Sequence, residues 1–249
     1  MDAFLFTTSK KSAKIAQKKN FLFLFCANIC IFAAHSHSVM YKKNPLLQFA
    51  GIPVTGADIL SCFPDLASPE KKVQSLEKSG ELIRIKRNLY IVNQELTGRE
   101  TDVRLCANHL YGPSYVSFQW ALRYYGMIPE QVFLMTSATT KRTRSFETPI
   151  GNFSYIQVPV SYFPIGVECK EEHGVSFLMA TIEKALCDTI LLDNHVPNQS
   201  IKSLSVYLEE DMRLDMDILA ELDTEIIEQC AQSGRKTKIF QNLTRLIKR

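Results

Sequence analysis

Basic and amide side chains gather in two neighbouring segments of the chain, residues 71–78 and residues 84–87. Ammonium and guanidinium groups neutralise phosphate, and amide groups form hydrogen bonds with the edges of nucleic-acid bases. The motifs of familiar enzymes, GxGxxG, GxxxxGK(S/T), HExxH and GxSxG, are all missing from the 249 residues. These observations favour binding to nucleic acid over catalysis, and we expect neither enzyme activity nor a cofactor. The predicted contacts are Lys71, Lys72, Gln74, Ser75, Lys78, Arg84, Lys86 and Arg87.

A third basic segment, Lys141-Arg142-Thr143-Arg144, follows a predicted strand. Ammonium and guanidinium groups in a loop suit a phosphate group or an acidic protein surface. A solvated loop that binds nothing would have the same sequence, so both interpretations stay open. The predicted contacts with phosphate or a partner are Lys141, Arg142 and Arg144.

One tripeptide matches part of a metal site. Glu168-Cys169-Lys170 fits half of the (D/E)xK signature of restriction-nuclease-like enzymes, but an aspartate at suitable spacing on a preceding strand is missing. A metal-dependent nuclease is therefore kept only as the alternative function. Glu183 and Asp188 are five residues apart and do not share one helix face. Capping and ion pairing explain these two carboxylates better than a paired-carboxylate site.

The net charge of +3 gives no support to nucleic-acid binding, because the first 39 residues alone carry +4 and the remainder carries −1. Within the remainder, residues 205–234 hold nine acidic groups and a single arginine, and residues 235–249 hold six basic groups and no acid. We expect the last two helices to match each other electrostatically, although the basic helix could also contact phosphate. The seven cysteines are scattered and form no CxxC pair, so we interpret them as core residues in a reducing compartment.

Residues 1–39 form a leader of distinct composition. Five lysines precede a 14-residue apolar run, residues 21–34, which is short for a membrane span and has the layout of a secretory signal. Export would separate a nucleic-acid-binding protein from its target, whereas translation starting at Met40 would remove the conflict. We therefore expect a mis-assigned start or a signal-like segment, and a cytoplasmic protein without membrane contact if translation starts at Met40. A regulator anchored in the membrane by residues 21–34 is the remaining alternative.

The elements that hold the basic segments follow from capping signals. Thr55-Gly-Ala-Asp58 predicts a capping box at the start of a short helix, and Pro64 is expected to end that helix. Ser68 is expected to cap a second helix that has Pro69 in its first position. The order helix, turn, helix is thus predicted before residue 80.

The second helix and the residues after it complete a recognisable pattern. Val73 and Leu76 are spaced to face inward, which leaves the basic and amide residues on the outer faces, and Gly80 is expected to end the helix. Apolar and basic residues alternate over residues 82–92, which predicts a two-stranded ribbon with Asn88 in its turn. Residues 40–95 are therefore predicted to form a winged helix-turn-helix, whose second helix enters the major groove of DNA while the ribbon contacts the backbone.

Residues 96–249 are predicted to form a larger mixed α+β domain around a small antiparallel sheet, with helices at the C-terminal end. The expected helices cover residues 101–111, 114–126 and 180–192 and most of the chain after residue 195. Thr181 is the expected cap of the helix over 180–192. The expected strands cover residues 132–135, 146–148, 153–158, 166–168 and 175–178.

The two halves together resemble AbiEi-type antitoxins. The segment LIRIKRNLYIV (82–92) is similar to the arginine-rich ribbon that ends the N-terminal domain of that family. The ordered segments YVSFQWALRYYG (115–126), MTSATTKR (135–142), FETPIG (146–151) and MATIEKALCD (179–188) are similar to its C-terminal domain. Asn88 replaces a glycine that is usual in the family's ribbon, and Ile182 stands where proline is common.

The resemblance implies an antitoxin of a type IV toxin–antitoxin system. Such a protein would repress its own operon by binding inverted repeats in double-stranded DNA. Its C-terminal domain would counter a nucleotidyltransferase toxin, and no stable complex between the two proteins is expected. A transcriptional regulator without an antitoxin role remains an alternative.

Overall fold

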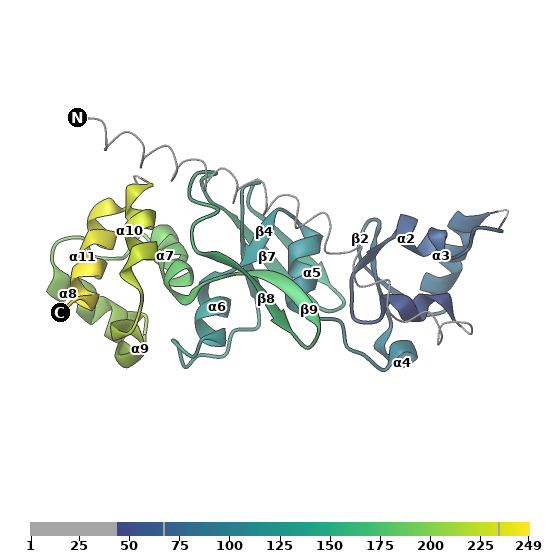
Figure 1. Ribbon diagram of the computed structural model, residues 1–249, viewed down its shortest axis with the longest axis horizontal. Helices are drawn as coiled ribbons and strands as arrows, with labels where there is room; N and C mark the ends of the chain where they lie inside the picture. Colours follow the sequence, from purple (N-terminus) through teal and green to yellow (C-terminus); the bar gives the residue numbers. More distant parts are fainter. Residues whose placement is uncertain (1–43, 67, 234) are drawn as a thin grey trace, which may run out of the picture. The chain divides into compact units, whose positions relative to one another are not determined.

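The computed structural model describes residues 44–66, 68–233 and 235–249. The predictions for the leader, residues 1–39, and for a start at Met40 lie outside these residues. The chain divides into two compact units at Gln48 and Phe49, so the residues from Phe49 onward belong to one unit. That unit is mixed α+β and contains two sheets, of which one is small and antiparallel (Figure 1). None of the helices in the described ranges combines the length and the apolar character needed to cross a bilayer.

The first elements are short and begin where capping signals predict. They are η1 (Pro45–Phe49), β1 (Val54–Thr55), α2 (Gly56–Ser61) and α3 (Pro69–Lys78). The predicted capping box is confirmed: the Asp58 amide donates to Thr55 Oγ1 at 3.3 Å, and the Thr55 amide donates to Asp58 Oδ2 at 2.8 Å. Proline occupies the start of α3 as predicted, but Ser68 makes no side-chain capping bond there. The Ser68 cap was therefore wrong, because its backbone, at φ −143° and ψ 72°, does not direct the hydroxyl to the helix amides.

A three-stranded antiparallel sheet with the order β1-β3-β2 follows α3. Strands β2 (Leu82–Lys86) and β3 (Leu89–Val92) form the predicted ribbon, and Gly80 takes the predicted left-handed conformation. Asn88 lies in the turn with φ 61°, a region that asparagine tolerates better than most residues. Its side-chain carbonyl also accepts a hydrogen bond from the Gly56 amide at 3.1 Å. Asn88 therefore fixes the turn of the ribbon and ties it to the start of α2.

Replacing Asn88 by alanine is expected to lower the free energy of unfolding by about 1–2 kcal/mol, because alanine is disfavoured at this φ and cannot accept the hydrogen bond. Urea denaturation followed by circular dichroism measures the change. Asn88→Gly, which keeps the turn and removes only the hydrogen bond, should cost less. Equal stability of Asn88→Ala and the wild type would contradict this role.

The larger sheet contains six strands in the order β6-β7-β5-β4-β9-β8. Its strands are β4 (Ser114–Val116), β5 (Met135–Thr139), β6 (Arg144–Thr148), β7 (Gly151–Gln157), β8 (Val167–Glu172) and β9 (Val175–Ala180). Pairs β4–β9 and β5–β7 are parallel, and the remaining pairs are antiparallel. The sheet of residues 96–249 is thus mixed, which corrects the prediction of an antiparallel sheet. Antiparallel hairpins join β6 to β7 and β8 to β9.

Two predictions in this region were wrong. Residues 114–116 are a buried central strand and not the first turn of a helix, and helix α6 (Phe118–Tyr124) begins only after them. Strand β5 begins at Met135 and not at residue 132, while Phe133 is 84% exposed just before it. Periodicity does not distinguish a helix from a strand in a short apolar segment. Here the pairing of β4 with β5 and β9 determines that residues 114–116 form a strand.

Helices cover the sheet and form the C-terminal region. The helices after the small sheet, apart from α6, are α4 (Gln94–Thr97), α5 (Val103–Leu110), α7 (Ile182–Leu192), α8 (Ile201–Val206), η2 (Tyr207–Asp211), α9 (Met216–Ala220), α10 (Thr224–Gln232) and α11 (Thr237–Ile247). Helix α5 packs on β4 and β9, and α10 packs on both α7 and α11 (Figure 1). Thr181 caps α7 as predicted, since its hydroxyl accepts from the Lys184 amide at 3.2 Å.

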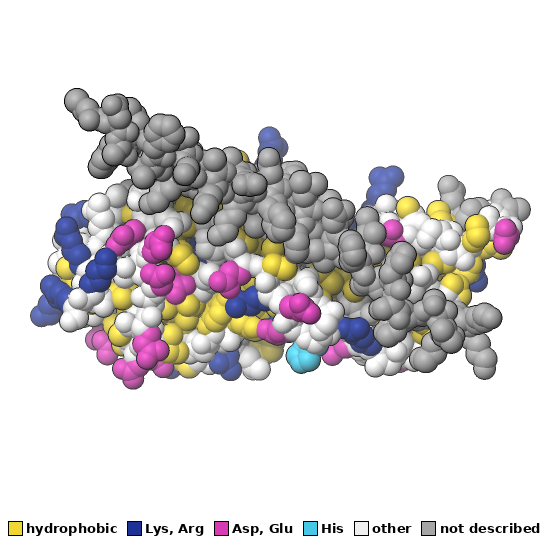
Figure 2. Space-filling view, in the orientation of Figure 1, with side chains coloured by type: hydrophobic (Ala, Val, Ile, Leu, Met, Phe, Trp, Pro, Cys, Tyr) yellow, Lys and Arg dark blue, Asp and Glu magenta, His cyan; other side chains and the backbone are white. Residues whose placement is uncertain are grey.

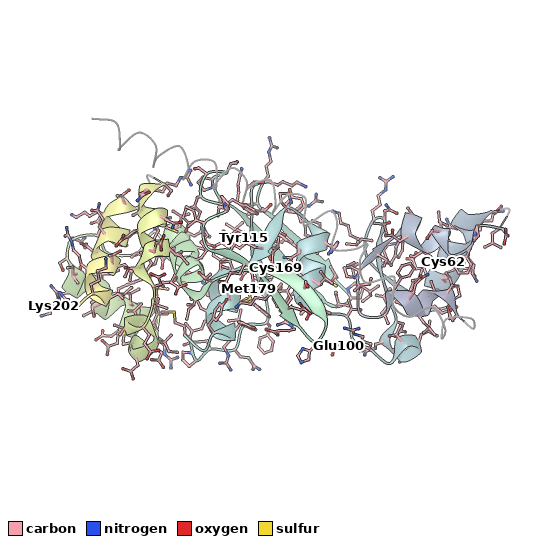
Figure 3. The ribbon with its side chains drawn as sticks, viewed as in Figure 1. Cys62, Glu100, Tyr115, Cys169, Met179 and Lys202 are labelled. Atoms are coloured by element: carbon pink, nitrogen blue, oxygen red, sulfur yellow. The ribbon has the colours of Figure 1, made fainter. Side chains whose placement is uncertain are left out.

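Charges on the last helices compensate one another. Lys248 of the basic segment lies 2.7 Å from Glu228 on α10, so the predicted match between the acidic and basic segments is confirmed at this pair. Figure 2 shows acidic and basic side chains next to each other over these helices. Three described cysteines, Cys106, Cys187 and Cys230, are buried as predicted, whereas Cys169 is exposed on β8 (Figure 3).

Two residues of α7, Lys184 and Asp188, form a fully buried ion pair. Lys184 Nζ is 3.1 Å from Asp188 Oδ1, and both side chains are completely inaccessible to solvent. The other carboxylate oxygen, Asp188 Oδ2, accepts from Ser117 Oγ at 2.6 Å and from the Tyr115 hydroxyl at 3.0 Å. Lys184 Nζ also donates to the Tyr162 carbonyl at 3.0 Å. Asp188 is thus a structural residue that joins α7 to β4, which agrees with the ion pairing predicted for it.

Candidate nucleic-acid interface

Helix α3 has an apolar, buried face and a polar, exposed face. Val73 and Leu76 are buried, as their spacing predicts, and their burial anchors the helix. Lys72 is half-buried, with its ammonium group 5.3 Å from the centre of the Phe63 ring. The other predicted contacts on this helix are exposed: Lys71, Gln74, Ser75 and Lys78. Their exposure is confirmed, and their binding to DNA stays a prediction.

A shallow groove of about 450 Å³ runs between α3 and β2 and is lined by Gln74, Glu77, Lys78 and Arg84. Arg84 Nη2 lies 2.6 Å from Glu77 Oε2, and the guanidinium group is 5.6 Å from the centre of the Tyr90 ring. Arg84 was predicted as a phosphate contact, but its charge is already paired with a carboxylate of α3. This pair could not be predicted from the sequence alone, because Glu77 lies on α3 and Arg84 on β2.

Lys86, which was also predicted to contact phosphate, lies against the six-stranded sheet and the end of α5. Its ammonium group donates to the Leu110 carbonyl at 2.8 Å, and it lies 5.9 Å and 5.5 Å from the ring centres of Tyr111 and Phe146. Burial lowers the pKa of Lys86, and the nearby positive charges of Arg144 and Lys141 lower it further. Lys86 is thus half-buried and faces the six-stranded sheet, and its contact with phosphate stays a prediction.

Arg87 is exposed, as a cation of the ribbon that contacts phosphate must be. It lies in the turn between β2 and β3. Among the described residues, no carboxylate forms an ion pair with Arg87. Of the three ribbon cations, it is the one best placed to meet a phosphate group.

The loop before β6 brings further positive charge to the same rings. Lys141 Nζ donates to the Gly112 carbonyl and lies 5.3 Å from the Tyr111 ring centre, and the Arg144 guanidinium is 4.8 Å from the Phe146 ring centre. Arg142 is exposed, and only its backbone carbonyl is used, by the Tyr111 hydroxyl at 3.2 Å. Within the described ranges, none of these three cations forms an ion pair.

The structure thus joins two predicted sites that are far apart in sequence. Lys86, Lys141 and Arg144 surround the Tyr111–Phe146 pair, whose ring centres are 5.6 Å apart. We call this set the cation cluster. No carboxylate in the described part of the chain forms an ion pair with these three cations, so they produce a local positive potential that attracts anions. Charge counting along the chain could not find the cluster, since more than fifty residues separate Lys86 from Lys141.

The other candidate chemistry is not assembled into a site. Glu168 and Lys170 form an ion pair of 3.4 Å on strand β8. The part of the chain that the structure describes holds no group of three or more His, Cys, Asp or Glu side chains placed to bind a metal ion. Glu183 accepts from the Asp223 amide at 3.3 Å, away from the buried Asp188.

Comparison of the chain with protein-family models and with curated protein sequences finds no match. The candidate interface therefore depends on its own residues: the polar face of α3, the exposed Arg87 and the basic loop at residues 141–144.

Proposed function

We propose that α2, α3 and the strands β1–β3 form a winged helix-turn-helix that binds double-stranded DNA, with α3 in the major groove and the ribbon β2–β3 as the wing. The observation that carries the proposal is the exposed polar face of α3, followed directly by a ribbon whose turn presents Arg87. A helix with an apolar inner face and a polar outer face next to a basic ribbon has the form needed to enter the major groove.

The exposed residues divide into two roles. Gln74 and Ser75 have the side chains that read base edges, whereas Lys71, Lys78 and Arg87 suit backbone phosphate. Arg142 and Arg144 add charge that supports contacts outside the major groove. Arg84 is left out of the direct contacts, because Glu77 already neutralises it.

The proposed biological role is a cytoplasmic transcriptional autoregulator that binds inverted repeats in its own operator. The resemblance to AbiEi-type antitoxins extends this proposal to a type IV antitoxin that counters a nucleotidyltransferase toxin from the same operon without a stable complex. Co-expression with the product of the adjacent gene tests that extension. Toxicity that persists when this protein is present would leave a regulator without an antitoxin role.

Replacing Gln74 by alanine is expected to change sequence preference more than affinity for random DNA. A well-placed amide contact discriminates against the wrong base by about 1–3 kcal/mol, which is roughly a 5- to 150-fold ratio of affinities. Selection from a randomised DNA pool, followed by fluorescence anisotropy, measures the preference of wild type and variant. An unchanged preference would contradict the placement of α3 in the major groove.

The nuclease alternative has its own test. Plasmid DNA incubated with the protein and Mg²⁺ should stay intact, and Glu168→Ala should behave in the same way. Cleavage by the wild type that is lost in Glu168→Ala would replace the proposed function with the alternative.

A further inference from the structure

We propose that Lys86 is a positioning residue that fastens the ribbon β2–β3 to the six-stranded sheet, and that it does not contact phosphate. The proposal deepens the proposed function, because a fastened ribbon would hold α3 and the basic loop at residues 141–144 in one fixed arrangement on DNA. Its first test uses the protein without DNA and does not depend on that function.

The contacts of Lys86 lie at the end of α5 and on the six-stranded sheet. Lys86 is the last residue of β2, and its ammonium group donates to the carbonyl of Leu110, the last residue of α5. The final carbonyls of a helix have no partner within the helix and carry partial negative charge, so a cation is favourable there. The rings of Tyr111 and Phe146 add two cation–π contacts to the same ammonium group. Lys86 therefore connects the ribbon with α5 and with β6.

Apolar packing supports the same connection. Ile85, Leu89 and Ile91 of the ribbon belong to the buried cluster that also contains Leu110 and Tyr155. Such packing holds the two surfaces together but is not directional. A hydrogen bond from a charged donor is directional and stronger than a neutral one, so Lys86 sets the orientation that the apolar contacts allow.

The neighbouring charges oppose this fastening. Lys141 and Arg144 lie over the same two rings, and their repulsion lowers the pKa of Lys86 together with its burial. The ammonium group stays in place because the Leu110 carbonyl and the ring faces compensate the repulsion. Removing the ammonium group of Lys86 should loosen the ribbon, because the hydrogen bond to Leu110 and the two cation–π contacts are lost with it. Removing the charge of Arg87, one residue further, should not.

Hydrogen–deuterium exchange of the DNA-free protein tests the fastening. In Lys86→Met, which keeps the length of the side chain, the amides of residues 82–92 and 107–111 are expected to exchange roughly fivefold faster or more than in the wild type. Lys86→Arg should restore most of the protection, because a guanidinium group can also donate and stack. Arg87→Met is the matched control and should leave exchange in these segments unchanged.

The salt dependence of DNA binding separates positioning from phosphate contact. Loss of one phosphate contact reduces the slope of log K against log salt by about 1. Arg87→Met should show that reduction, whereas Lys86→Met should weaken binding with its slope unchanged. A reduced slope in Lys86→Met together with unchanged exchange would overturn the proposal and make Lys86 a phosphate contact.

Two further outcomes are decided by the same design. If the wild type binds no DNA, the proposed function fails, and the exchange experiment still decides whether Lys86 fastens the ribbon. If Lys86→Met does not fold, Phe146→Leu removes one of the two rings and should give a smaller increase in exchange in the same segments. Unchanged exchange in a folded Phe146→Leu variant would then count against the proposal.

Discussion

Replacing Asp188 by alanine is expected to lower the free energy of unfolding by about 3–5 kcal/mol, the usual effect of removing one partner of a buried ion pair. The variant leaves the ammonium group of Lys184 without its carboxylate in a fully inaccessible site. It also removes the acceptor of the Ser117 and Tyr115 hydroxyl groups. Urea denaturation followed by the fluorescence of the single tryptophan, Trp120, measures the loss.

Three further variants separate the contributions to this effect. Asp188→Asn keeps a hydrogen-bond acceptor and removes the charge, so it should be destabilised less than Asp188→Ala. Adding Lys184→Met to Asp188→Ala should recover part of the stability, because no unpaired charge is then buried. The exposed Glu210→Ala is the control and should change stability by less than about 0.5 kcal/mol. If Asp188→Ala were as stable as Glu210→Ala, the structural role of the buried pair would be refuted.

Replacing Lys71, Lys78 and Arg87 together by methionine is expected to weaken DNA binding on every sequence. Each phosphate contact contributes about 0.9 to the slope of log K against log salt, so the slope should become shallower by about 2.7. All three side chains are exposed, and their replacement should leave the fold intact. Fluorescence anisotropy between 50 and 200 mM salt, roughly the range over which such effects are large, gives both affinity and slope.

A charge-matched variant is the control for this experiment. Lys202, Arg235 and Lys238 are exposed and lie outside α3 and the ribbon, so replacing them changes the net charge by the same amount. Binding should then stay close to that of the wild type. Equal losses in the two triple variants would mean that net charge, and not the face of α3, determines affinity.

Local signals were the part of the fold that could be predicted. The capping box at Thr55 and Asp58, the cap at Thr181 and the turn at Asn88 each involve residues within a few positions of one another. The inward spacing of Val73 and Leu76 likewise predicted which side of α3 would be exposed. Such features depend on backbone geometry over one turn, which a single sequence contains.

Features that depend on distant partners were missed. Residues 114–116 form a strand because β5 and β9 pair with them, and neither partner is adjacent in the sequence. The same limit explains why the intramolecular contacts of two ribbon cations were not foreseen. Arg84 and Lys86 look alike in sequence, yet one pairs with Glu77 and the other lies against Leu110 and Phe146. Sequence shows where charges are, whereas only the fold shows which of them are already neutralised.

The most direct test of the central claim compares two DNA duplexes, one from the region upstream of the gene and one with the same bases in scrambled order. The account predicts tighter binding to the upstream duplex, with log K decreasing linearly as log salt rises, by about 0.9 for each phosphate contacted. Binding that is absent, or equal for the two duplexes at all salt concentrations, would contradict it.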